Sequence, residues 1–490
     1  MDYALLIKQF SPDNHGKLSA QRKLHAALRN AIQEGALAPG SRLLASRVLA
    51  QELGIARNTV VYAYEQLLSE GFVSSDRRGS IVNSIAQVAQ QLQTASVTDR
   101  ADLGLSRRAG RVMPLPVAAD LTTGFAPGVP SLADFPKNLW RKSLDASWRR
   151  LNVAQLGYAD AAGEPDLRAA IAEYLRASRG VTCDAEQVIV TDGTQSSLDL
   201  CAHALADAGD KVWMENPGYV GAQIAFQSAQ LKLIGIAVDG DGIAPTMQDW
   251  HAYRPKFVYV TPSHQYPTGQ VLSLNRRLEL IQQARLHGAL IIEDDYDSEF
   301  RHDGPPLIAM QGLVPDAPVI YLGTFSKTMF PALRIAYLVV PKNLVQTMRG
   351  LVEKTSLRGR SADQICLAKF IRDGHFLTHL RRMRRLYRQR RDVLVSLLQA
   401  QLSDVATVQG DSAGMHLSLC FHDTSWDDVA ISQHALTLGV VAPALSKHSV
   451  GRRRHAWCGL MLGYAQVPAE LMPALVEQLQ ISIRLHAKSV

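Results

Sequence analysis

Apolar side chains recur at helical spacing in three stretches between residues 16 and 83. The first covers about 24–37 and is closed by a Pro-Gly pair. The second covers about 46–53, the third begins near residue 58, and each ends at a glycine. A short run with polar turn residues follows, which is typical of a β-hairpin. The pattern predicts one compact unit of three helices and a hairpin over 16–83.

The pattern changes twice after this unit. Residues 84–117 are rich in Gln, Ala, Ser and Arg and lack a sustained apolar period, which is typical of a linker. Over residues 118–490, short apolar runs alternate with helical stretches, and this alternation predicts an α/β domain with a largely parallel sheet. The predicted strands include 188–190, 211–214, 257–260, 289–292, 319–322 and 336–340.

Composition and charge narrow the class of protein. The chain has 490 residues, 47% of them hydrophobic, and a formal net charge of +7, which suits a polyanionic partner but also a basic enzyme. Five widely spaced cysteines without a Cys-x-x-Cys pair predict neither a zinc site nor a disulfide framework, and favour a reducing compartment. We find no signal peptide and no run of roughly 18 apolar residues that would span a membrane. We therefore expect a cytoplasmic protein without a metal site.

The segment 35–73 reads GALAPGSRLLASRVLAQELGIARNTVVYAYEQLLSEGFV. It resembles the winged helix-turn-helix of GntR-type regulators in its whole order: helix, Pro-Gly turn, Ser-Arg helix, Arg-Asn-Thr helix and wing. The resemblance implies that the third helix enters the major groove of duplex DNA. The implied DNA contacts are Ser46 and Arg47 on phosphates, Arg57, Asn58, Thr59 and Tyr62 near base edges, and Arg77 and Arg78 at the wing tip.

Two details depart from the GntR pattern. Leu44-Ala45 stands where Pro-Ser is usual, and the wing reads RRGSIV where Gly-Ser-Gly-Thr is common. Both concern phosphate and wing contacts and not the fold. An ordinary three-helix bundle with solvated arginines would share the helical periods, but not the complete unit with its wing.

The stretch Gly323–Leu338, GTFSKTMFPALRIAYL, follows a predicted strand. It resembles the Schiff-base segment of fold-type I aminotransferases. The resemblance implies that Lys327 binds pyridoxal 5′-phosphate (PLP) as an internal aldimine and that Ser326 and Arg334 hold its phosphate. Lysine suits this chemistry because burial lowers its pKa. A Ser-Lys pair alone would equally describe a surface lysine in a loop.

Further motifs at the ends of predicted strands fit the same family. They are TDGTQ at 191–195, ENPGY at 215–219, PSHQYPTG at 262–269 and IIEDDYD at 291–297. The implied cofactor contacts are Gly193, Thr194 and Gln195 at the phosphate, Tyr219 on the ring, His264 in a turn that holds Tyr266 where Asn is usual, Asp294 at the pyridine nitrogen and Tyr296 at the 3′ oxygen. Tyr158 matches a tyrosine that reaches the partner subunit's phosphate, which implies a homodimer, although a tyrosine buried in packing would also fit.

One position departs from the aminotransferase pattern in a way that bears on function. Aminotransferases hold the substrate α-carboxylate with an arginine just before a run that here reads Leu462–Ala465, and this position holds Met461. Arg452–Arg454 lie upstream in an expected solvated loop. The arginines over 381–391 mark an amphipathic helix whose basic face suits solvent better than DNA. Ordinary transamination of amino acids is therefore not expected.

Together, these motifs identify the chain as similar to the MocR/GabR subfamily of GntR-type regulators. The implied fold is an all-α winged helix-turn-helix, then an α/β PLP-dependent transferase fold of type I with a smaller C-terminal α+β subdomain over about 345–490. We expect a DNA-binding transcription regulator that senses PLP or an amine or amino-acid-like effector. The alternative is a working aminotransferase that carries a DNA-binding unit.

Overall fold

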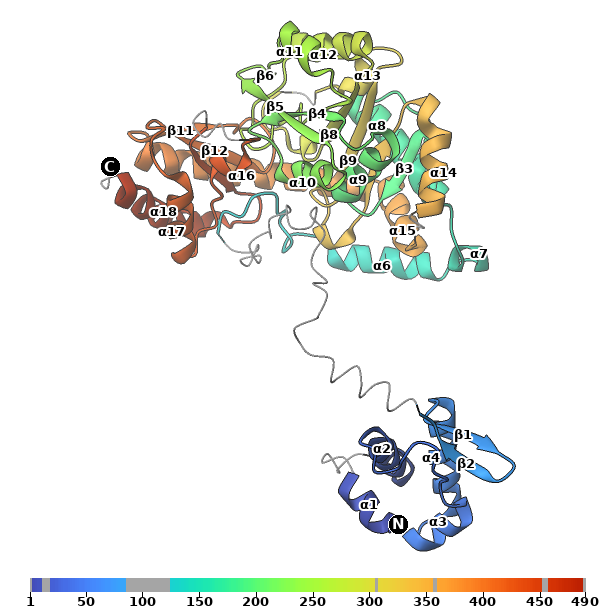
Figure 1. Ribbon diagram of the computed structural model, residues 1–490. Coiled ribbons are helices and arrows are strands. Elements are labelled where there is room, and N and C mark those ends of the chain that lie inside the picture. The colour runs from blue at the N-terminus through green and yellow to red at the C-terminus, as the bar shows by residue number, and fades with distance from the viewer. Residues whose placement is uncertain are drawn as a thin grey trace. The chain divides into compact units, whose positions relative to one another are not determined.

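The structure, a computed structural model, describes residues 2–10, 18–84, 124–304, 307–355, 359–451 and 457–487. Most of the predicted linker therefore lies outside the described residues. The chain divides into two compact units, Met1–Gly104 and Leu105–Val490, and each is described by itself (Figure 1).

The first unit is helical with one hairpin, as the sequence predicts. Its elements are α1 (Tyr3–Phe10), α2 (Ala20–Gln33), α3 (Ser46–Leu53), α4 (Arg57–Ser69), β1 (Val73–Asp76) and β2 (Gly79–Val82). Its core is made of buried aliphatic side chains from the three predicted helices, with Leu28, Ile32, Leu49 and Val60 fully enclosed.

Helix α1 begins before the predicted start of the unit at residue 16. It packs on α2 and α3, where Tyr3 and Leu6 join the apolar core. The Tyr3 backbone N–H donates to Glu52 at 2.9 Å. A helix of 8 residues is marginal alone in water, so α1 depends on this packing.

The second unit is built on an eight-stranded sheet in the order β3-β10-β9-β8-β7-β4-β5-β6. The strands are β3 (Val188–Thr191), β4 (Lys211–Asn216), β5 (Lys232–Asp239), β6 (Gly242–Ile243), β7 (Phe257–Val260), β8 (Leu290–Asp295), β9 (Val319–Thr324) and β10 (Ala336–Val339). Pairing is parallel from β9 to β5, while β10 and β6 run antiparallel to their neighbours. The carboxyl ends of β4, β7, β8 and β9 therefore meet at one edge, where an open α/β sheet binds its ligands.

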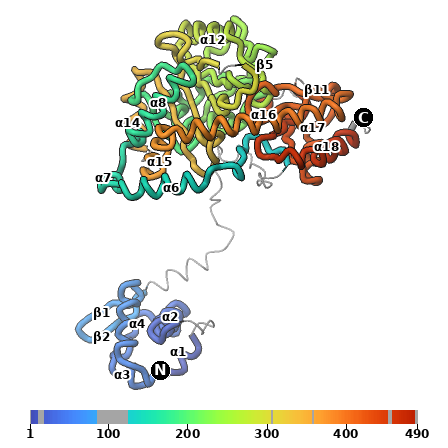
Figure 2. Tube along the Cα trace, turned by 180° about the vertical axis from the view of Figure 1, so that it is seen from behind, coloured from blue at the N-terminus to red at the C-terminus, as the bar shows by residue number. Residues whose placement is uncertain are grey.

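Helices cover both faces of this sheet (Figures 1 and 2). They are α6 (Lys137–Trp148), α8 (Pro165–Arg179), α9 (Thr194–Leu205), α10 (Val220–Ser228), α11 (Met247–Tyr253), α12 (Leu274–His287), α13 (Met310–Leu313), α14 (Val345–Thr355) and α15 (Ser361–Arg372). The short helix α7 (Val153–Leu156) follows α6 and has no buried residue. Neighbouring residues of one strand face opposite layers: Ile292 packs in the layer with α9 and α10, and Ile291 in the layer with α11 and α12. None of the helices in the described ranges is both long and apolar enough to cross a membrane.

The smaller subdomain holds a three-stranded antiparallel sheet of β11 (Ala406–Gln409), β12 (His416–Phe421) and β13 (Gly459–Gly463). Helices α16 (His375–Leu402), α17 (Asp428–Thr437) and α18 (Met472–Ala487) pack with it (Figure 2). The predicted boundary near residue 345 is too early. Because α14 packs on α9, and α15 on α6 and α8, both helices belong to the large sheet.

Candidate cofactor site and DNA interface

Lys327 lies in the turn after β9, at the ligand-binding edge of the large sheet. Its Nζ donates to the carbonyl oxygen of Gly128 at 2.7 Å. Gly128 has a φ of +72°, and a Cβ there would lie 2.8 Å from Nζ, so only glycine allows this approach. Burial lowers the pKa of Lys327, while the charges of Asp297 and Asp294 partly oppose that shift. A lysine with a lowered pKa supplies the uncharged amine that attacks an aldehyde.

Asp294, the next-to-last residue of β8, is buried, and its charge acts on Lys327. Its Oδ2 accepts from the Tyr259 hydroxyl at 2.6 Å, whereas its buried Oδ1 has no partner among the described residues. Burial raises the pKa of Asp294 to about 7, and the hydrogen bond from Tyr259 opposes this. An orphaned oxygen of this kind fits the protonated nitrogen of a pyridine ring.

The neighbouring carboxylates on β8 are engaged elsewhere. Asp295 pairs with Arg179 at 2.7 Å and accepts from the Tyr321 hydroxyl at 2.6 Å. Glu293 accepts from the backbone N–H groups of Met310 and Gln311. Because alternate residues of a strand face opposite sides, Asp294 is the carboxylate of these three that faces the site.

Two of the phosphate residues predicted from the sequence, Gly193 and Arg334, lie side by side at the N-terminus of α9. Gly193 has a φ of +105°, and a Cβ there would lie 2.9 Å from the guanidinium carbon of Arg334. Ser326 follows Phe325 in the turn that carries Lys327, and it is partly exposed. The Gln195 side chain donates to the Gly221 carbonyl at 2.9 Å. A helix N-terminus beside an exposed guanidinium suits a phosphate.

Arg360 is a residue of this region that sequence reasoning missed. Its guanidinium donates to the carbonyl oxygens of Leu333 and Arg334, at 2.9 and 2.7 Å, and lies 3.4 Å from Asp192. Arg334 is held in the left-handed region with a φ of 50°, and these bonds secure its turn. No motif surrounds Arg360, which precedes α15 far along the chain.

Aromatic side chains from the strand ends form another part of the site: Tyr219, Tyr266, His264 and Tyr296. Tyr219 meets Tyr266 edge to face, with ring centroids 5.3 Å apart. The Tyr296 hydroxyl donates to the His264 carbonyl at 2.9 Å and lies 3.1 Å from its Nδ1. His264 Nδ1 in turn lies 3.1 Å from Asp297.

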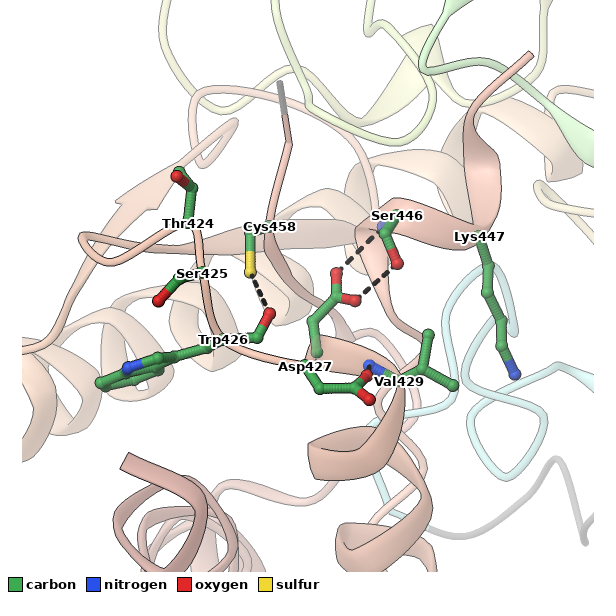
Figure 3. Close-up of a pocket in the computed structure, with 9 residues that line it drawn as sticks. Thr424, Ser425, Trp426, Asp427, Val429, Ser446, Lys447 and Cys458 are labelled. Atoms are coloured by element: carbon green, nitrogen blue, oxygen red, sulfur yellow. Dashed lines mark hydrogen bonds between the residues drawn. The ribbon is translucent and has the colours of Figure 1, made fainter. Parts of the chain in front are cut away.

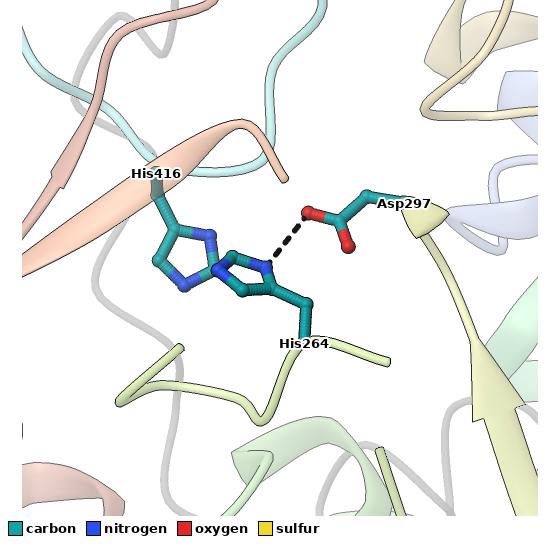
Figure 4. A group of neighbouring side chains, drawn as sticks. All are labelled: His264, Asp297 and His416. Atoms are coloured by element: carbon teal, nitrogen blue, oxygen red, sulfur yellow. Dashed lines mark hydrogen bonds and ion pairs between the residues drawn. The ribbon is translucent and has the colours of Figure 1, made fainter. Parts of the chain in front are cut away.

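His416, the first residue of β12, lies beside these rings, and the sequence did not point to it. Asp297 ends the predicted motif at 291–297, where it was an alternative to Asp294 at the pyridine nitrogen. The rings of His416 and His264 are 4.6 Å apart, and both are buried (Figure 4). His264, Asp297 and His416 place their ligand-type atoms within 4.8 Å of one another, a grouping that could hold a metal ion. No metal site was expected from the sequence; we interpret the group as part of the cofactor site, because the charge of Lys327 acts on both His416 and Asp297.

Three glycines bring the small subdomain onto the loop 263–269. A Cβ on Gly410 would lie 2.6 Å from the Cα of Gly269, and a Cβ on Gly414 would lie 2.2 Å from the His264 ring. All three have a positive φ, at 76°, 72° and 80° for Gly269, Gly410 and Gly414. The backbones therefore touch with no side chain between them.

Tyr158 lies apart from these groups within the chain, whereas Met461 lies on the small sheet that faces the loop 263–269. Tyr158 is 90% exposed and lines a surface hollow with Asp160, Arg349 and Glu353. Met461 is buried on β13, opposite Ser418 on β12. Arg452–Arg454 lie outside the described residues.

Most arginines of the basic helix α16 make contacts within the protein. Arg382 pairs with Asp134 at 2.9 Å, Arg384 donates to the Glu299 carbonyl, and Arg391 contacts Asp303. Arg388 and Arg390 bond to backbone carbonyl oxygens as well. These contacts tie neighbouring loops to the helix, which disfavours the alternative that DNA wraps on this face.

A separate hollow of about 540 Å³ lies beside α17 (Figure 3). Several of its polar groups bond to one another: Asp428 accepts from the backbone N–H and the hydroxyl of Ser446, and the Cys458 thiol donates to the Trp426 carbonyl at 3.2 Å. No polar atom named in these bonds is left for a ligand.

In the first unit, α3 and α4 present the residues predicted to contact DNA. Arg47, Arg57 and Asn58 are exposed, while Thr59 and Tyr62 are partly buried. The Arg57 Nε lies 3.5 Å from the Ser46 hydroxyl, so the first turns of the two helices adjoin. The Tyr64 hydroxyl donates to the Leu44 carbonyl at 2.8 Å and fixes α4 against the preceding turn.

The wing carries Arg77 and Arg78, both exposed, in the turn between β1 and β2. Asp76 accepts two bonds from Arg42, at 2.8 and 2.7 Å, and one from the Arg78 backbone N–H. The Arg42 guanidinium holds the pKa of Asp76 at about 2. Sequence reasoning missed Arg42, whose guanidinium fork holds the end of β1 next to the turn of the wing.

Fold and site together define a DNA-binding unit of the winged type joined to an aminotransferase-type domain. Residues 20–82 match the bacterial regulatory proteins of the gntR family, and residues 128–455 match aminotransferase class I and II. The chain belongs to the MocR-type family of transcription regulators. It is 40% identical to the "Probable rhizopine catabolism regulatory protein MocR" of Rhizobium meliloti, over 94% of this chain and 93% of that protein. The predictions of family and fold are confirmed.

Further comparisons give the same family of regulators and the same aminotransferase fold. The pyridoxine biosynthesis transcriptional regulator PdxR of Corynebacterium glutamicum is 32% identical over 81% of each chain. Among solved structures, LysN, the alpha-aminoadipate aminotransferase of Thermus thermophilus in complex with N-(5′-phosphopyridoxyl)-L-leucine, has a TM-score of 0.70 at 25% identity, covering 79% of this chain and 98% of that one. A multiple substrate aminotransferase from Thermococcus profundus has a TM-score of 0.72 at 24% identity, covering 79% and 98%, and shows the fold alone.

Asp294→Asn should weaken PLP binding at least about tenfold, because it removes the charge opposite the pyridine nitrogen. It should also change the pH dependence of the PLP-free protein. The pKa of Asp294 is about 7 in the folded chain, against about 3.9 when unfolded. The folded state therefore holds the extra proton between these values, and the free energy of unfolding falls as the pH rises through them.

The variant lacks this contribution and should lose less stability than wild type between pH 4 and 7, measured as a difference by urea unfolding. Asp241→Asn, on an exposed side chain, is the control. If Asp294→Asn binds PLP as tightly as wild type, Asp294 is not the carboxylate at the pyridine nitrogen, and Asp297 becomes the candidate.

Proposed function

We propose that this DNA-binding transcription regulator senses a small amine through PLP bound at Lys327. The observation that carries the proposal is a pair of groups that interact across one space: the partly buried Lys327 with its lowered pKa, and the buried Asp294 with an oxygen that has no partner in the described part of the chain. The PLP-derived group in the LysN structure and the PLP-linked name of PdxR support it.

PLP, when bound, supplies an aldehyde that captures primary amines and a ring that withdraws electrons. In this proposal Asp294 holds a proton at the pyridine nitrogen. Arg334, Ser326 and the backbone of Gly193 and Thr194 bind the phosphate. Tyr219 would cover one ring face, and the Lys327 amine, which here donates a hydrogen bond to the Gly128 carbonyl, would give up that hydrogen bond to bind the aldehyde.

The second candidate function is a working aminotransferase with an attached DNA-binding unit. The aminotransferase family match favours it. Met461 argues against it, because a thioether cannot orient a substrate carboxylate, and orientation is a large part of catalysis. We therefore place the aminotransferase-type domain in the role of a sensor.

We further propose that the protein acts in the cytoplasm as a homodimer. All five cysteines are free thiols, which suits a reducing compartment that also contains DNA. A run of exposed apolar side chains surrounds Tyr158: Trp148 at 59%, Val153 at 86% and Leu156 at 65% exposure. Such a patch marks a protein interface, and a second copy would bring Tyr158 to its partner's phosphate site.

PLP should attach covalently to Lys327. The PLP-loaded protein should show a visible absorption band, and borohydride should bleach it and fix the label on the peptide that contains Lys327. Lys327→Ala should abolish labelling, while Lys342→Ala, on an exposed lysine, should not. Labelling of Lys327→Ala at the wild-type yield would refute the assignment.

The two arginines of α3 and α4 should behave differently in DNA binding by the full chain. Arg57→Ala should cost about 1–3 kcal/mol on the operator and relax sequence preference, because Arg57 reaches a base edge. Arg47→Ala should weaken all sequences alike and lower the salt slope by about one, because Arg47 binds a phosphate. Electrophoretic titrations at several salt concentrations, with and without PLP, measure the affinity and the salt slope of each variant. If both substitutions weaken binding to every sequence equally, Arg57 does not contact a base.

The exposed patch should be the dimer contact. Sedimentation should give twice the chain mass of 53.7 kDa. Leu156→Asp should shift the protein toward monomer, whereas Leu286→Asp, on α12 with 70% exposure, should leave the mass unchanged. A monomeric wild-type protein would contradict both the interface and the role of Tyr158.

A further inference from the structure

One face of the small sheet lies on the loop 263–269 of the cofactor site. In the register of β12 and β13, His416 pairs with Gly463 and Ser418 with Met461. Alternate residues of a strand, and residues directly opposite across a pair, share a face. His416 and Met461 are therefore on one face with Ser418, whose hydroxyl donates to the Pro267 carbonyl at 2.8 Å.

Met461 occupies the place where the sequence pattern of aminotransferases puts the carboxylate-binding arginine. Its thioether offers neither positive charge nor a hydrogen-bond fork. None of the hydrogen bonds or ion pairs found in the described residues joins an arginine or lysine to His416, His448 or Tyr266. Among the residues that the structure describes, this part of the site therefore offers no fixed arginine or lysine for a ligand carboxylate.

Imidazole groups stand there instead. His416 is 1% exposed, and in the described chain neither of its ring nitrogens makes a hydrogen bond of good geometry, although the Pro267 carbonyl lies near enough to raise its pKa slightly. His448, 7% exposed, has a Nδ1 without a hydrogen bond in the described residues, and the Gly218 backbone acts on its ring in the same way. The ring of Tyr266 lies between them, with its centroid 5.4 Å from each imidazole. Buried polar atoms are normally bonded, so these await a polar ligand or water.

These imidazoles are uncharged near neutral pH. Burial lowers the pKa of His416 well below its ordinary value, and lowers that of His448 to about 4. A neutral imidazole offers one donor and one acceptor. A hydroxyl group also donates and accepts, so the two match. A carboxylate only accepts, and its charge would stay uncompensated in this buried place.

We propose that the amine sensed by this protein carries hydroxyl groups where an amino acid carries its carboxylate, and that His416 and His448 bind them. The ligand class is a hydroxylated primary amine, whether an amino alcohol, an amino sugar or an amino cyclitol. Its carbon skeleton lies along Tyr266, and its amine points to Lys327. The inference rests on the proposed binding of PLP at Lys327 and adds the chemistry of the ligand.

Matched probes separate the two ligand classes. Serinol and L-serine differ in a hydroxymethyl group against a carboxylate, and glucosaminitol and glucosaminic acid form a larger pair with the same difference. Each is titrated into the PLP-loaded full chain, and binding is followed by the change in the visible band and by operator affinity. At least one hydroxylated amine should bind about tenfold or more tightly than its acid, as expected for one or two added hydrogen bonds. Equal or tighter binding of both acids would overturn the inference.

Variants locate the effect. His416→Phe keeps the ring but removes its nitrogens, so it should weaken the preferred hydroxylated amine about tenfold and leave n-propylamine unchanged. His422→Phe, on an exposed histidine of the same subdomain, is the matched control. Met461→Arg should reverse the preference in favour of the acid. Wild-type preference in His416→Phe would overturn the role of His416.

The two proposals fail in distinguishable ways. If the protein does not take up PLP and shows no visible band, the proposed sensor function is wrong. If it takes up PLP but does not prefer hydroxylated amines over acids, only the present inference is wrong. Thermal melting and retention of the visible band are used to check that each variant is folded. If Met461→Arg does not fold, the His416→Phe variant still tests the inference by itself.

Discussion

The site depends on how strand β8 buries three consecutive carboxylates. Glu293, Asp294 and Asp295 are each no more than 4% exposed. Burying a carboxylate without a counter-charge costs several kcal/mol, so each must find compensation on its own side of the strand. Asp295 forms an ion pair with Arg179, and Glu293 accepts hydrogen bonds from backbone N–H groups. Asp294 accepts a hydrogen bond only from the phenolic hydroxyl of Tyr259, among the described residues. The cofactor site is therefore polar because the buried carboxylate of Asp294 still has an oxygen without a hydrogen-bond donor among the described residues.

Arg179 makes the arrangement possible from the opposite face. Besides Asp295 it bonds to the Ser263 hydroxyl at 2.9 Å and to the Leu307 carbonyl. Ser263 precedes His264, so the guanidinium that neutralises one carboxylate also sets the start of the loop under the ligand. The layer behind the sheet thus holds the rigid charge pair, and the layer in front keeps groups that can change partners. Preorganisation of this kind lets a binding site stay polar without collapsing onto itself.

Sequence predicted the parts of the site that are contiguous along the chain. Strand ends carrying short motifs placed Lys327, Asp294 and Gly193, because apolar runs and glycine turns are local signals. His416 could not be found in this way, since only the register of β12 brings it to the loop. Arg360 likewise acts through tertiary contact alone. Helix α1 and the late start of the small subdomain were missed for the same reason: both are decided by what a helix packs against, not by its own periodicity.

The glycine contacts between the subdomains have a consequence for how such a protein evolves. Gly410 and Gly414 lie outside both apolar layers of the large sheet and contribute nothing to either. A single added methyl group at Gly414 would strike the His264 ring and push the imidazole face away from the loop. The fold would survive, because no core residue is altered, while the fit to the ligand would be lost. Specificity in this architecture can therefore drift through backbone contacts at a distance from the covalent chemistry, leaving a stable protein that no longer responds to its former signal and is open to selection for a new one.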